Sequence, residues 1–162
     1  MMLMEGDKRG SNYALQLAYS ESPDDTFFIP ENLHIIGTMN TADRSLALVD
    51  YALRRRFAFI TLKPEFSSEK FSKLLLYQGA DQGLVQRIIH RMSALNDLIR
   101  EDAHNLGWGY TIGHSFFCPV GGALPDQDWF EQVIEFEIAP LLREYWVDDE
   151  SKAEAELEKL RS

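Results

Sequence analysis

The sequence predicts a mixed fold, in which a small α/β part is followed by an all-α part. Residues 33–62 fit a strand, a helix and a second strand with short connections, the pattern of a parallel, right-handed βαβ unit. Over residues 65–162 the apolar side chains instead recur every three or four residues in several segments, which is typical of a helical bundle. Pro64 closes the second strand and marks the boundary between the two parts.

The α/β part also contains a predicted β-hairpin. Residues 14–19 alternate in polarity, and residues 26–29 form a second β-prone run beyond a polar turn cluster. Residues 33–39 are a near-continuous apolar run, which predicts a fully buried strand. We then expect an amphipathic helix over residues 45–53 and another strand over residues 57–62.

Four helical segments are predicted in the second part. They cover residues 66–77, 84–103, 129–146 and 148–162; the second has the longest apolar periodicity, and the last is an acidic, alanine-containing helix or tail. Pro140 forces a break or kink near the middle of the third segment.

Composition and charge narrow the class of protein. The chain has 162 residues, 45% of them hydrophobic, which suffices for one domain or a domain plus a small subdomain. The single cysteine, Cys118, allows no internal disulfide, and the absence of a signal peptide or long apolar span predicts a cytoplasmic protein without membrane contact. The net charge of −10 argues against a DNA-reading surface, although the arginine excess in residues 40–100 suits a bound nucleotide.

Four polar residues follow the first buried strand: Asn40, Thr41, Asp43 and Arg44. Ligands of open parallel sheets bind beyond the carboxyl ends of the strands, so these residues form a candidate site. A turn-forming role for Asn40 and a helix N-cap role for Asp43 are the structural alternatives.

Three consecutive arginines, Arg54, Arg55 and Arg56, close the predicted helix of residues 45–53. Complementing the helix dipole would account for them, at about 0.3–1 kcal/mol each. Because consecutive side chains point in different directions, one of the three is also placed to project from the edge of the domain.

Two stretches carry a resemblance to a known family. Residues 37–45 (GTMNTADRS) and 50–57 (DYALRRRF) resemble the McrB family, the AAA+ GTPase subunits of modification-dependent, 5-methylcytosine-specific restriction systems. The resemblance implies the C-terminal part of an AAA+ P-loop NTPase. Residues 1–64 would then end the core, with a pre-sensor hairpin, the sensor 1 strand and the arginine-finger helix, and residues 65–162 would be the helical lid subdomain.

The resemblance also implies catalytic roles. Asn40 matches sensor 1, the residue that contacts the nucleotide and holds the attacking water near the γ-phosphate, where a neutral amide can both donate and accept. Arg55, or as second choice Arg56, matches the arginine finger that reaches the nucleotide of the neighbouring subunit. Such an arginine finger raises the rate of nucleotide hydrolysis by a factor of about 10³–10⁵.

Asp43 is another candidate nucleotide contact. Asn-Thr-Ala-Asp resembles the Asn-Lys-x-Asp motif with which Ras-like GTPases bind guanine, but Thr41 replaces the lysine. We favour a helix cap within a polar network of Thr41, Arg44 and Asp50.

Residues 112–117 occupy the place of the AAA+ sensor 2 segment, although Phe117 lies near where its arginine would fall. His114 is therefore a candidate nucleotide contact, with a buried structural histidine as the alternative. The remaining histidines show no metal-ligand spacing, so no metal site is predicted. We expect the neighbouring aromatic residues to be core rather than a base-stacking platform: Trp108, Tyr110, Phe116 and Phe117.

The family resemblance implies a GTP-hydrolysing subunit of a homo-oligomeric ring, with a nuclease subunit as partner and DNA bound through a domain outside this chain. GTP and Mg²⁺ would belong to the parent protein, because the chain contains neither a phosphate loop nor the Walker B acid. We therefore interpret the chain as a fragment that is inactive alone. The alternatives are a MoxR-like ATPase chaperone, which base preference would distinguish, and a non-catalytic helical interaction module, whose gene would lack an upstream phosphate loop.

Overall fold

The computed structural model describes residues 2–19, 22, 24–40 and 55–162. The chain divides into two compact units, Met1–Ile60 and Thr61–Ser162, which we treat separately. Within the part that the structure describes, no helix is long and apolar enough to cross a membrane.

The first unit begins with three short 3₁₀ helices and continues into a β-hairpin. The helices are η1 (Met2–Met4), η2 (Gly6–Lys8) and η3 (Ser11–Tyr13). Strand β1 (Leu15–Gln16) pairs antiparallel with β2 (Thr26–Phe27), and Leu15 lies opposite Phe27. The predicted hairpin is confirmed, with strands shorter than expected.

The two strands predicted for residues 33–39 and 57–62 are wrong for this structure. Neither segment is assigned as a strand, and Ile36 and Ile60 are 91% and 85% exposed. A parallel strand is stabilised by hydrogen bonds to neighbouring strands and by cover on both faces, which the described residues do not supply here. The predicted βαβ unit is therefore not formed in the described chain, and its helix over residues 45–53 lies outside the described residues.

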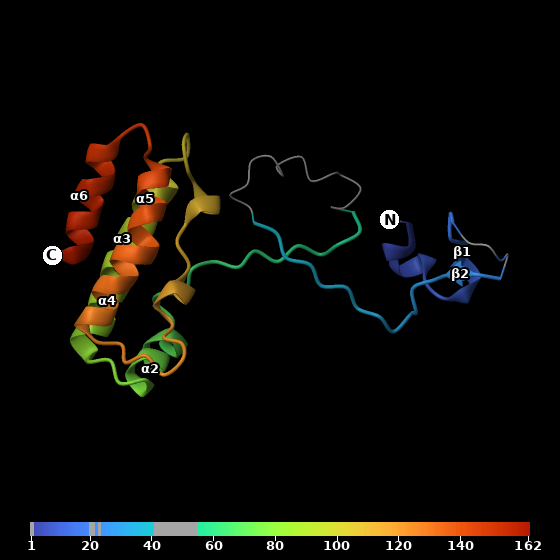
Figure 1. The fold of residues 1–162 in the computed structure, drawn as a ribbon, viewed down its shortest axis with the longest axis horizontal. Coiled ribbons are helices and arrows are strands. Elements are labelled where there is room, and N and C mark those ends of the chain that lie inside the picture. Colours follow the sequence, from blue (N-terminus) through green and yellow to red (C-terminus); the bar gives the residue numbers. More distant parts are fainter. Residues whose placement is uncertain (1, 20–21, 23, 41–54) are drawn as a thin grey trace. The chain divides into compact units, whose positions relative to one another are not determined.

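The second unit is a helical bundle. Its helices are α2 (Glu69–Tyr77), α3 (Gln82–Glu101), α4 (Gln127–Val133), α5 (Ala139–Tyr145) and α6 (Glu150–Arg161). Figure 1 shows α5 and α6 side by side; α6 also contacts α3, and α2 lies at one end of α3. Two 3₁₀ helices, η5 (Trp108–Tyr110) and η6 (His114–Phe117), lie in the connection from α3 to α4. The predicted helical segments are confirmed.

Local sequence explains where these helices begin. A serine or aspartate side chain accepts a hydrogen bond from the backbone N–H three residues later at four N-termini, which satisfies an otherwise unpaired donor. The capping residues are Ser68, Asp81, Asp126 and Asp149.

The predicted break at Pro140 takes the form of a π turn. Residues Ile134–Ile138 (η7) connect α4 to α5, and the Ala139 N–H donates to the carbonyl of Ile134, five residues back. A proline in a regular helix clashes with the carbonyl four residues earlier and lacks an N–H. The wider turn gives room for the Pro140 ring while the helical path continues.

Phe117 belongs to the buried core of the bundle. This side chain is fully buried, and its ring centroid lies 5.9 Å from that of Phe66 and 6.0 Å from that of Phe130. The inward face of α3 supplies much of the rest: Val85, Ile88, Met92, Leu95 and Ile99. These α3 positions are among those that the helical period predicts.

Candidate functional site

The predicted site residues are distributed over both units. Asn40, Arg55 and Arg56 lie in the first unit and His114 in the second. Four others lie outside the described residues: Thr41, Asp43, Arg44 and Asp50. Asn40 is exposed and does not follow a buried strand, contrary to the sequence prediction.

Arg56 is held by a carboxylate from the start of the chain. Its Nε and Nη2 both donate to Oε1 of Glu5, at 2.7 and 2.6 Å. The side chains are 22% and 31% exposed, so the pair is partly shielded from water. Glu5 was not predicted as a site residue, because nothing in the local sequence pattern connects residues 51 positions apart.

Arg55 is exposed and lines an open cavity of about 490 Å³ together with Glu5, Gly6, Asp7 and Arg56. Among the residues that the structure describes, none forms an ion pair with Arg55. The cavity walls carry two carboxylates and two guanidinium groups, so their charges balance and do not by themselves match a triphosphate.

The described part of the chain contains no cluster of metal-ligand side chains. No group of three or more His, Cys, Asp or Glu side chains there is arranged to hold a metal ion. Because Mg²⁺ at a nucleotide is held by one or two carboxylates together with phosphates and waters, this finding does not test the Mg²⁺ expected in the parent protein, and we derive no step through the ion.

His114 is tied to the start of the helical unit. Its Nδ1 accepts from the backbone N–H of Glu65 at 3.1 Å, and its ring lies edge-on to Phe66 and Phe71 at centroid distances of 6.2 and 5.7 Å. With Nδ1 as acceptor, the neutral imidazole carries its proton on Nε2, which is the nitrogen left for a ligand. His114 is half-buried, which is compatible both with a nucleotide contact and with a structural histidine.

The segment that carries His114 is fixed to α3 by a buried amide. Asn96 is 6% exposed; its Oδ1 accepts from the N–H of Ile112 at 2.7 Å and its Nδ2 donates to the carbonyl of Ile112 at 2.9 Å. Sequence analysis missed Asn96. The available signal was a polar residue on the apolar face of α3, between Met92 and Ile99.

Trp108 corrects one sequence prediction. Phe117 is buried as expected, but Trp108 is 59% exposed. The Trp108 ring is covered by two cationic side chains and not by core residues. Lys63 Nζ lies 5.1 Å from the centroid of the Trp108 ring, and the guanidinium carbon of Arg100 lies 4.7 Å from it. Cation–π contacts of this kind allow a large aromatic residue to remain at the surface.

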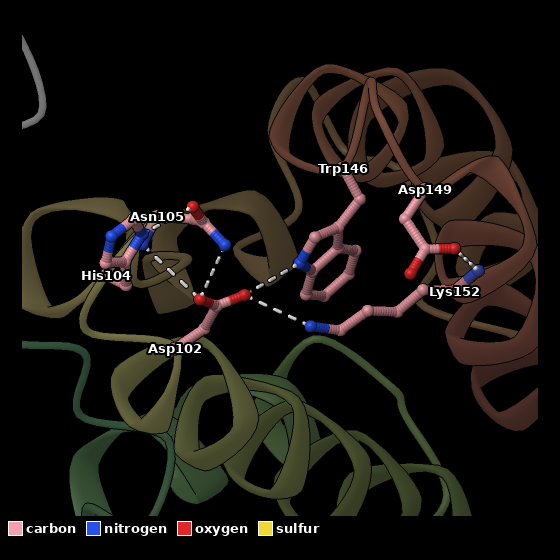
Figure 2. A network of polar contacts seen from close by, with 6 residues as sticks. All are labelled: Asp102, His104, Asn105, Trp146, Asp149 and Lys152. Atoms are coloured by element: carbon pink, nitrogen blue, oxygen red, sulfur yellow. Dashed lines mark hydrogen bonds and ion pairs between the residues drawn. The ribbon is translucent and has the colours of Figure 1, made fainter.

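A polar network joins three helices at one end of the bundle (Figure 2). Asp102, just after α3, accepts from Trp146 Nε1 at 3.3 Å, Lys152 Nζ at 3.1 Å and Asn105 Nδ2 at 3.0 Å. The hydrogen bond from Lys152 lowers the pKa of Asp102 most, burial opposes it, and the hydrogen bonds from Trp146 and from the backbone N–H of Asn105 lower the pKa further. Trp146 and Lys152 are far from Asp102 in the sequence, so the network was not predicted.

Comparison with known proteins identifies the family. Residues 87–154, which run from within α3 into α6, match the family described as "McrB, alpha-helical lid domain". The chain is 48% identical over 162 residues to the "Type IV methyl-directed restriction enzyme EcoKMcrB subunit" of Escherichia coli (strain K12). The chain belongs to the McrB family. This match covers 99% of the chain and 35% of the relative, so the McrB-like chain spans about a third of that protein's length.

The comparisons confirm the family resemblance and agree with the predicted helical lid. The assignment of residues 1–64 to an AAA+ core stays a prediction. So do the roles of Asn40, Arg55, Arg56 and His114.

Proposed function

We propose that this McrB-family chain acts within the GTP-hydrolysing subunit of a modified-cytosine-specific DNA restriction system. The main support for this proposal is that the chain is 48% identical, along 99% of its length, to a subunit of a methyl-directed restriction enzyme. In this proposal the first unit supplies groups for hydrolysis and the second unit is the lid.

Asn40 would orient the attacking water. In-line attack on a phosphoanhydride requires a water held by groups that can both donate and accept, and a carboxamide does both. The exposure of Asn40 supports this role, because the amide is accessible to a nucleotide bound by another part of the protein.

Arg55 would act in trans. Its exposed guanidinium would meet the charge that develops on the γ-phosphate in a neighbouring subunit of a homo-oligomeric ring. An arginine supplied in this way is worth about 10³–10⁵ in rate.

The remaining residues have supporting roles in the proposal. Asp43 would cap a helix next to Thr41, Arg44 and Asp50, and His114 would present Nε2–H on the lid. The system would include a nuclease subunit, and DNA would be bound outside this chain, since a net charge of −10 opposes phosphate contact.

The first experiment compares nucleotides. The purified full-length protein should hydrolyse GTP in preference to ATP, measured as phosphate release at matched concentrations. A preference for ATP would contradict the proposal and support a MoxR-like ATPase. A full-length protein without either activity would indicate a non-catalytic module.

The second experiment mixes two inactive proteins. Arg55→Ala subunits keep an intact nucleotide pocket, and subunits disabled at the phosphate loop keep Arg55. Mixed rings should regain part of the GTPase activity, because each functional interface combines the two intact halves. Ring formation is checked by light scattering. Mixed rings that stay as inactive as either variant would exclude Arg55 as the trans-acting arginine.

A further inference from the structure

The contact between Glu5 and Arg56 constrains one of the two candidate arginines. Both Nε and Nη2 of Arg56 donate to one carboxylate oxygen of Glu5, at 2.7 and 2.6 Å. Two charge-assisted hydrogen bonds along one edge of a planar guanidinium fix its orientation as well as its position. Because the side chains are only 22% and 31% exposed, water screens the pair less than a surface ion pair.

Glu5 is free for this contact because its own helix does not use its side chain. It occupies the N-cap of η2 with extended backbone and makes no side-chain capping bond. Asp7 is the other carboxylate at the cavity. Its Oδ2 lies 3.6 Å from Lys8 Nζ, and its side chain is 74% exposed. The cavity therefore contains one carboxylate that binds an arginine and one that remains at the surface.

Arg55 differs from Arg56 in this respect. It is exposed at the same cavity, and none of the described residues forms an ion pair with it. To reach another subunit, Arg56 would have to leave a charge-assisted, partly shielded pair, whereas Arg55 would break no such pair with the residues that the structure describes. Fixing Arg56 also restrains the backbone beside Arg55, which lowers the cost of ordering Arg55 for catalysis.

We propose that Glu5 is a positioning residue that holds Arg56 within its own subunit and so leaves Arg55 as the arginine that acts on the neighbouring subunit. The second half of this statement rests on the proposed function. The first half rests only on the geometry of the first unit.

The decisive variant exchanges the two charges. Full-length Glu5→Arg and Arg56→Glu should each lower Tm without nucleotide, and the double variant should restore it. The matched control is Asp7→Arg with Arg56→Glu, which places the same charge on the wall of the same cavity and should give no recovery. If the double variants fold, equal recovery by both or by neither would overturn the pairing of Glu5 with Arg56, whatever the protein hydrolyses.

GTP hydrolysis then tests the division of roles. The folded charge-swapped protein should keep GTPase activity within about tenfold of wild type, since Arg55 is intact, whereas loss of the finger costs about 10³–10⁵. A swapped protein with wild-type Tm and the activity of Arg55→Ala would overturn the proposal and assign the finger to Arg56. A wild-type protein without GTPase activity would instead refute the proposed function and leave the pairing to the Tm result.

A second pair covers the case in which the swapped protein does not fold. Glu5→Gln with Arg56→Gln removes both charges together, and the two amides can hydrogen-bond to each other. This double variant should keep more activity than Arg55→Gln, and its residual defect should be relieved by mixing with phosphate-loop variants, because the defect lies on the finger side of the interface. Activity as low as that of Arg55→Gln, or no relief on mixing, would refute the positioning role.

Discussion

Removing the charge of Asp102 should destabilise the helical unit. The carboxylate accepts from the Lys152 ammonium, the Trp146 indole and the Asn105 amide, and its side chain is 14% exposed. A hydrogen bond to a charged group contributes about 1.5–3 kcal/mol. Lys152 is 32% exposed, which weakens its share, so we expect Asp102→Asn to lower the free energy of unfolding by about 2 kcal/mol.

That loss converts to a measurable change in melting temperature. For a unit of this size, each kcal/mol corresponds to about 4–8 °C, so Tm should fall by about 8–16 °C. The measurement is thermal unfolding at pH 7, followed by far-UV circular dichroism. Glu101→Gln is the control, because it removes an equal charge from the neighbouring, exposed residue. If both variants melt at the same temperature, the network contributes nothing to stability, which would refute the predicted loss for Asp102→Asn.

The pH dependence gives an independent test. The pKa of Asp102 is lowered in the folded protein, so its contribution to stability is complete above the ordinary aspartate pKa of about 3.9 and is lost as pH falls through the folded value. The Tm gap between wild type and Asp102→Asn should therefore be constant near neutral pH and close in acid. A gap that persists unchanged at the lowest pH at which the protein folds would refute a charge-based role.

Asn96→Ala should cost about 2–4 kcal/mol in urea unfolding, because both backbone groups of Ile112 lose their buried partner; a smaller loss would mean that water replaces the amide. His114→Phe keeps the ring but removes the acceptor, so the Glu65 amide should exchange faster with solvent than in His114→Asn, and equal rates would contradict the Nδ1 contact. In the full-length protein, Asn40→Ala should lower kcat for GTP with little change in nucleotide Kd, whereas an equal loss in binding would indicate that the amide holds the bound nucleotide rather than the attacking water. The isolated chain should hydrolyse no GTP, because its sequence contains no phosphate loop, and phosphate release above a mock preparation would overturn that expectation.

The helices were predictable because their determinants are local. Apolar spacing along α3, the capping residues Asp81 and Asp126, and Pro140 all act within one or two turns of their own position. The π turn was not predictable in detail, since a proline in a helix can be accommodated by a kink, a break or a wider turn.

The two missing strands show the limit of the same method. An apolar run such as residues 33–39 indicates that a segment requires burial, but not which residues provide it. With Ile36 and Ile60 exposed, the described chain does not provide it here. The hairpin prediction was correct because β1 and β2 pair with each other, so the determinants of the hairpin lie within one short stretch of sequence.

The site shows a related asymmetry. Motif similarity placed Arg55 first and Arg56 second as the candidate finger, but it gave no information on the contacts that either side chain makes. Their environments do separate them: one guanidinium is held by Glu5 and the other is exposed. Because an arginine that acts between subunits must be available to leave its own surface, the contact that sequence analysis missed is the one that favours Arg55 over Arg56.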